Sequence, residues 1–197
     1  MTDFETIEPV IQRICDSAAD ALRRFFKLTD FPPDWMHESF MASYVFHRLG
    51  NEISMMPEVK VSTLWEWNRS TTNGPPQPLP DENLGQKIRG QRRVDLVVFR
   101  PWNIPKNQQH IWCLIEFKRN AEVGSDICKL KPLLPLFVGC EFGAACGVAD
   151  TDKWGDWLLE EPKTALARGE RFLTCQQPWR TPDEARSFTV FAYVFPA

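Results

Sequence analysis

The sequence predicts an α/β protein in which all residues, 1–197, form one domain. Near the N-terminus, apolar residues recur at spacings of three and four, which is typical of an amphipathic helix. In the middle of the chain, the runs 93–99 and 111–118 are apolar and rich in β-forming residues, which is typical of strands. The composition, with 43% hydrophobic and 25% charged residues, is that of an ordinary globular protein, and the length fits one core.

Two helices are expected before the first strand. The apolar spacing predicts the first over residues 7–26. A second helix is expected from Asp34 or His37 to Leu49, where a glycine and an asparagine follow. Glu38 lies in the first turn of this helix. Its carboxylate either points inward to the sheet or interacts with the helix dipole.

The segment 58–67 alternates and is rich in β-formers, so it is expected to be the first strand. Residues 68–90 contain several prolines and glycines within a polar stretch, which predicts a mobile loop. The two apolar strands follow, joined by a proline-broken turn at 101–107.

Four further elements complete the expected order α-α-β-β-β-α-β-α-β. A third helix is expected from Asp126 to Lys131, because apolar residues there recur on one helical face. The small-residue run 142–149 suits a strand that a helix approaches closely. The other two expected elements are a partly helical segment around Trp154 and Trp157, and a final strand over 187–195.

Charged residues within the two apolar strands indicate a functional site. Side chains alternate along a strand, so Glu116 and Lys118 share one face, away from Phe117. If the strands pair as neighbours, Asp95 comes near Glu116, and two carboxylates beside an amine suit a divalent cation in a hydrolytic site. The alternative is an ion pair between Lys118 and either carboxylate on an exposed sheet face.

The charge balance argues modestly against a free-standing nucleic-acid binder. The chain has 23 Lys and Arg against 26 Asp and Glu, a formal charge of -3. A local basic run nevertheless precedes Asp95, and it either contacts phosphate or forms a solvated loop. The run consists of Lys87, Arg89, Arg92 and Arg93.

The cysteines and the N-terminus indicate a cytoplasmic protein. None of the six cysteines forms a C-x-x-C pair, so free, mostly buried thiols are expected. The first residues are acidic where a secretory signal would be basic, and no apolar run is long enough for a membrane span. A metal-independent enzyme using Cys113 or Cys128 would need a general base, for which the sequence offers no supported candidate.

The charged residues and their strand context carry a family resemblance. Glu38, Asp95, Glu116 and Lys118 occur in the order of a helical Glu, a strand Asp and an E-x-K on the next strand. Locally, the chain resembles the D-h-V-h, h-h-E-h-K and D-h-x-K-L patterns of small bacterial PD-(D/E)xK, or restriction-endonuclease-like, nucleases. The matching runs are Val94-Asp95-Leu96-Val97-Val98, Leu114-Ile115-Glu116-Phe117-Lys118 and Asp126-Ile127-Cys128-Lys129-Leu130. The resemblance spans residues 38–150, with Val94 where the family name has proline.

The resemblance implies a restriction-endonuclease-like core, α-β-β-β-α-β, with a central mixed sheet flanked by helices. This core would cover residues 34–150, with an extra N-terminal helix and a C-terminal extension. The implied activity is divalent-metal-dependent hydrolysis of nucleic-acid phosphodiester bonds, with DNA favoured over RNA. A homodimer is expected where both strands of a duplex are cut. No membrane partner is expected.

The resemblance also assigns residues to roles. Mg²⁺ or Mn²⁺ would be held by Asp95, Glu116, the carbonyl of Phe117 and Glu38, with Lys118 as a catalytic amine beside the two carboxylates. Substrate-binding roles are expected for Arg92, Arg93, Asp126 and Lys129. For the last two, a helix N-cap and a solvated lysine are the alternatives. The competing functional class is an inactive protein of the same fold that acts as a binding or structural subunit.

Overall fold

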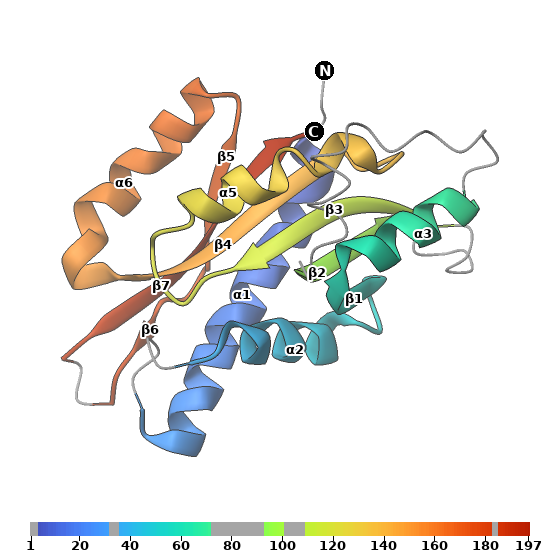
Figure 1. The fold of residues 1–197 in the computed structure, drawn as a ribbon. Coiled ribbons are helices and arrows are strands. Elements are labelled where there is room, and N and C mark those ends of the chain that lie inside the picture. Colours follow the sequence, from blue (N-terminus) through green and yellow to red (C-terminus); the bar gives the residue numbers. More distant parts are fainter. Residues whose placement is uncertain (1–3, 32–35, 72–92, 101–108, 183–184) are drawn as a thin grey trace.

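The computed structural model describes residues 4–31, 36–71, 93–100, 109–182 and 185–197 (Figure 1). A seven-stranded mixed sheet has the strand order β1-β2-β3-β4-β7-β5, and β6 pairs with β7. β3 and β4 are parallel, and the other neighbouring strands are antiparallel. The helices are α1 (Phe4–Thr29), α2 (Glu38–Leu49), α3 (Val61–Thr71), α5 (Gly124–Leu130) and α6 (Thr151–Ala167), with a 3-10 turn at Leu134–Leu136. The strands are β1 (Met55–Lys60), β2 (Arg93–Arg100), β3 (His110–Phe117), β4 (Phe142–Asp150), β5 (Arg171–Thr174), β6 (Trp179–Arg180) and β7 (Ser187–Pro196).

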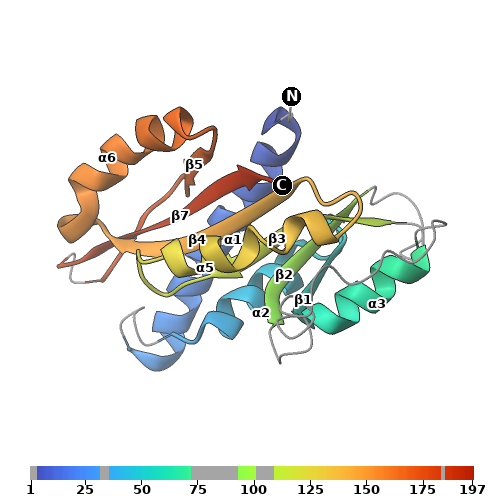
Figure 2. The same ribbon diagram turned by 45° about the horizontal axis from the view of Figure 1, so that its top comes forward.

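Helices cover both faces of the sheet. α1 and α2 pack on one face, where their apolar stripes join alternate residues of the strands in the largest core cluster. The opposite face carries α3, α5 and α6, whose buried residues form two further clusters with the strands. Seen from the side that brings α5 forward, α5 lies across β3 and β4, between α3 and α6 (Figure 2). The α/β class with a mixed sheet flanked by helices is therefore confirmed.

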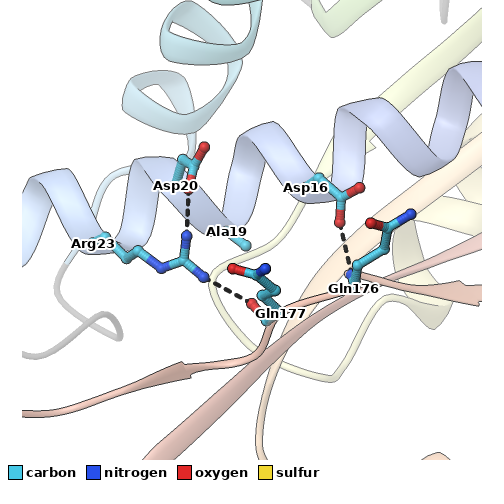
Figure 3. A pocket seen from close by; sticks show the side chains of 6 residues that line it. All are labelled: Asp16, Ala19, Asp20, Arg23, Gln176 and Gln177. Carbon is cyan, nitrogen blue, oxygen red and sulfur yellow. Dashed lines mark hydrogen bonds and ion pairs between the residues drawn. The ribbon is translucent and has the colours of Figure 1, made fainter.

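α1 is held to the segment between β5 and β6 by polar contacts (Figure 3). The carboxylate of Asp16 accepts a hydrogen bond of 2.7 Å from the backbone N–H of Gln176. Arg23 donates to the carbonyl of Gln177 at 3.0 Å and pairs with Asp20 at 2.5 Å. These residues surround a small polar pocket of about 150 Å³. The pocket's side chains are thus engaged in fastening the N-terminal helix to the sheet edge.

β4 allows close approach because it is built from small residues. A Cβ atom added at Gly147 would lie 2.4 Å from a ring carbon of Phe191 and 2.8 Å from the carbonyl oxygen of Asn120. Glycine is therefore required there by space, since β7 places large aromatic rings beside β4. The expectation that this run is a strand is confirmed, whereas the closest neighbours of Gly147 are Phe191 of β7 and Asn120 rather than a helix.

One expected element was wrong. The expected strand 58–67 is instead the end of β1 followed directly by α3, and residues 68–71 belong to α3 rather than to a loop. Val61, Leu64 and Trp65 are buried at helical spacing, which accounts for the change from strand to helix. The remainder of the expected loop, 72–90, lies outside the described residues, as does the expected turn at 101–107.

The other expected elements occur in the expected order, and β5 and β6 are additional. All six cysteines are free, and Cys128 is the exposed one. Within the described ranges, no helix has the length and apolar character needed to cross a membrane.

Candidate functional site

The strand register brings three carboxylates to one level of the sheet. β2 pairs with β3 so that Leu96 lies opposite Ile115, and the next position of this antiparallel register sets Asp95 opposite Glu116. On the other side of β2, the register with β1 sets Glu58 opposite Asp95. The pairing of strands that the sequence argument required is therefore present, and Glu58 is an additional carboxylate beside the pair.

Asp95 links its own strand to the end of the next. Its Oδ2 accepts a hydrogen bond of 2.8 Å from the backbone N–H of Phe117. Burial raises the pKa of Asp95, whereas this hydrogen bond and the charge of Lys129 lower it, and the charge of Glu58 raises it further. Asp95 is therefore a positioned, largely desolvated carboxyl group.

Glu116 is the most deeply buried group of the site, with a side chain only 5% exposed. Its Oε1 lies 2.5 Å from Nζ of Lys129, as an ion pair. Burial raises the pKa of Glu116 to about 8, the charge of Asp95 raises it as well, and Lys129 acts in the opposite direction. The two carboxyl groups thus repel each other when both are ionised.

Lys118 lies between the two helical layers. Its backbone N–H donates to the carbonyl of Cys146, which continues the pairing of β3 with β4. Its Nζ lies 3.8 Å from Glu38 Oε1 of α2 and 3.5 Å from Asp126 Oδ1 of α5. Glu38 therefore faces the site. The amine in contact with Glu116 is that of Lys129.

α5 presents Asp126 and Lys129 to the sheet, three residues apart on one helical face. The residue at the N-cap position is Val123, so the N-cap alternative for Asp126 is wrong. Asp126 is buried, and burial raises its pKa. The solvated alternative for Lys129 is also wrong, since its Nζ contacts Glu116 and donates to the carbonyl of Arg93 at 2.9 Å.

The basic residues expected before β2 are described only in part. Arg93 is exposed, and its guanidinium lies 3.9 Å from Glu58 Oε2. The other members of the run, Lys87, Arg89 and Arg92, lie outside the described residues. On the α2 side of the site, a pocket of about 210 Å³ is lined by Met36, His37, Glu38 and Arg119.

Sequence reasoning missed Glu58 as a member of this site. The signal was present, because an acidic residue in a strand next to β2 can meet Asp95. It was overlooked because the first strand was expected over 58–67, and this segment alone did not indicate which of its residues would lie opposite Asp95. Glu58 also has a positive φ of 52°, a conformation that alternation along an ideal strand does not anticipate.

The donor set suits a hard divalent cation with few protein ligands. Among the described residues, no group of three or more His, Cys, Asp or Glu side chains converges as a metal site. Mg²⁺ is commonly bound by one or two carboxylates together with water and substrate phosphates, so the pair Asp95 and Glu116 is sufficient in kind. Asp126 Oδ2 is a buried oxygen that accepts no hydrogen bond within the described part of the chain, and the contact of the buried Glu116 Oε1 is its ion pair with Lys129.

The charges of the cluster favour the same kind of ligand. The cluster consists of charged side chains that are joined by ion pairs and short-range interactions. It contains five carboxyl groups and three cationic groups: Glu38, Glu58, Asp95, Glu116 and Asp126, and Arg93, Lys118 and Lys129. With every group ionised, two negative charges would remain in excess. A divalent cation would balance this excess.

A cysteine-based site is not supported. Cys113 is fully buried, and burial raises its pKa well above the ordinary value, which disfavours the reactive thiolate.

Comparisons of the chain with protein-family models, curated proteins and solved structures found no match. The charged side chains around Asp95 and Glu116 are therefore the structural feature that points to a function.

Proposed function

We propose that this chain is a divalent-metal-dependent nuclease with a restriction-endonuclease-like core, and that DNA is its preferred substrate. The observation that carries the proposal is the pair of carboxyl groups on adjacent strands, the buried Glu116 and the half-buried Asp95, two residues before Lys118 on β3. Burying two such groups side by side is costly unless a cation compensates for them. The order of elements from α2 to β4 is consistent with the proposed core, with α3 inserted between the first two strands.

The roles proposed for the residues are those that the resemblance implies. Asp95, Glu116 and the carbonyl of Phe117 would hold Mg²⁺ or Mn²⁺, with Glu38 contributing directly or through water. When bound, such an ion stabilises charge on a phosphate oxygen and makes water more acidic.

Lys118 contacts carboxylates of the two neighbouring helices rather than Glu116. Its ammonium group, held between Glu38 and Asp126, can donate to a phosphate oxygen and stabilise the negative charge that develops on it during hydrolysis. Its half-buried side chain, 29% exposed, leaves it accessible to a substrate.

The test is a cleavage assay with matched variants. Wild type, Asp95→Ala, Lys118→Ala and the control Lys131→Ala are incubated with labelled single-stranded and double-stranded DNA and RNA, in Mg²⁺, Mn²⁺ or EDTA. Lys131 is the control because it is a lysine at the end of α5 that pairs with Glu170, outside the site. We expect cleavage that requires metal, is retained by the control and is lost in the other two variants. Circular dichroism must first show that all four proteins are folded.

The second candidate is an inactive protein of the same fold that serves as a binding or structural subunit. It is favoured by one observation: both lysines of the site are already paired with carboxylates of the cluster. Absence of cleavage by folded wild type on every substrate, together with absence of Mn²⁺ binding by calorimetry, would favour this candidate. Light scattering on the same samples tests the expected homodimer.

A further inference from the structure

Lys129 makes two short contacts with oxygen atoms inside the site. Its Nζ lies 2.5 Å from Glu116 Oε1 and 2.9 Å from the backbone carbonyl oxygen of Arg93. The side chain is 25% exposed, so most of its length is covered by the protein. A carboxylate and a backbone carbonyl are the oxygen ligands that a hard cation takes, and here an ammonium group takes them.

The position of Lys129 differs from that expected of a substrate contact. Lysines that bind phosphate present their charge to solvent, where the substrate arrives. Lys129 instead directs its charge to Glu116, and its field also acts on Asp95 and Asp126. Lys118 makes its direct contacts with other carboxylates, those of Glu38 and Asp126. The two lysines of the site therefore have different partners.

We infer that the Lys129 ammonium is a tethered counter-cation of the Asp95 and Glu116 pair, which a divalent ion must displace from Glu116 in order to bind. The inference rests on the proposed function, because it concerns the same ion. Lys129 is thus a positioning residue: its ammonium group occupies the Oε1 side of Glu116 in the metal-free protein and weakens metal binding by competition.

The test measures metal binding rather than activity. Mn²⁺ is titrated calorimetrically, at physiological ionic strength, into chelator-treated wild type, Lys129→Met, Lys129→Arg and Lys131→Met. Removing one positive charge in contact with a ligand should tighten Mn²⁺ binding by about tenfold or more. Lys129→Arg restores the charge, so we expect it to bind weakly, as wild type does. Lys131→Met tests for general effects of removing a lysine at the end of α5. If Lys129→Met does not fold, Lys129→Gln replaces it, because glutamine retains a donor for the carbonyl of Arg93.

The outcomes separate this inference from the proposed function. Equal or weaker Mn²⁺ binding by a folded, uncharged Lys129 variant overturns the inference, and it leaves the proposed function standing if wild type cleaves DNA with metal. Binding by the uncharged variant alone supports the inference, and an inactive wild type would then contradict the nuclease. Absence of binding in every variant overturns the inference, and the cleavage assay of wild type then decides the proposed function independently.

Discussion

Replacing Glu116 by glutamine should change how the stability of the protein depends on pH. Glu116 has a pKa of about 8 in the folded protein, raised from an ordinary 4.5, chiefly by burial. Between the ordinary pKa of 4.5 and the folded pKa of about 8, the unfolded chain has released the proton of Glu116 while the folded protein still holds it. Rising pH therefore favours the unfolded state, and glutamine, which does not titrate, abolishes this effect.

The magnitude follows from the size of the shift. Each unit of pKa difference corresponds to about 1.4 kcal/mol, so the full effect of Glu116 is on the order of 5 kcal/mol above pH 8 and zero below the unfolded pKa. Glutamine also changes the contact with Lys129, which contributes an offset. The quantity to measure is therefore the difference in unfolding free energy between Glu116→Gln and wild type, followed as the pH is changed.

Urea unfolding, followed by circular dichroism in EDTA, measures it for wild type and Glu116→Gln from about pH 5.5 to 9. Over this range, we expect Glu116→Gln to gain about 3 kcal/mol relative to wild type. Glu122→Gln is the control, because Glu122 is exposed and its offset should stay constant. A Glu116→Gln curve parallel to wild type over the whole range would refute the assignment of a raised pKa to this carboxyl.

Other residues give separate tests. Asp95→Asn keeps an oxygen that can accept from the N–H of Phe117 but removes the charge, so Mn²⁺ affinity measured by calorimetry should fall by about tenfold or more while the fold is retained. Gly147→Ala should lower the free energy of unfolding in urea by about 1–3 kcal/mol, because the added methyl meets an aromatic ring and a carbonyl. Gly155→Ala, inside α6 with nothing within 4 Å of the added methyl, should instead raise it by about 0.5–1 kcal/mol. Cys128 should be the single thiol that a thiol reagent modifies rapidly in the native protein, and modification of several thiols at the same rate would contradict the burial of the other five.

Much of the fold could be predicted from the sequence because its elements follow simple periodicities. The buried stripe of α1 and the small residues of β4 are local patterns. α3 was missed because Val61 and Thr63 are β-branched and favour strands, while the helical spacing of its buried residues is evident only once one face is known to be covered. β5 has only four residues and is stabilised by pairing with β7, which local sequence does not encode.

The candidate site was predictable at the level of strands and not at the level of side-chain partners. Alternation and the order of the apolar runs were enough to bring Asp95 near Glu116, because register is determined by which faces are buried. The exchange of partners between the lysines was not predictable. Lys118 and Lys129 have long, flexible side chains, and their choice among carboxylates depends on how α2 and α5 approach the sheet.

The pairing of β2 with β3 shifts by one residue between Val98 and Phe99, with Trp112 as the extra residue of β3. The shift divides this hairpin into a part that carries the site and a part next to the connection between the strands. On the site side, the register at Leu96 and Ile115 determines the position of Asp95. On the other side, pairing follows its own register. The register that sets Asp95 opposite Glu116 is therefore separated by the bulge from the register next to the connection.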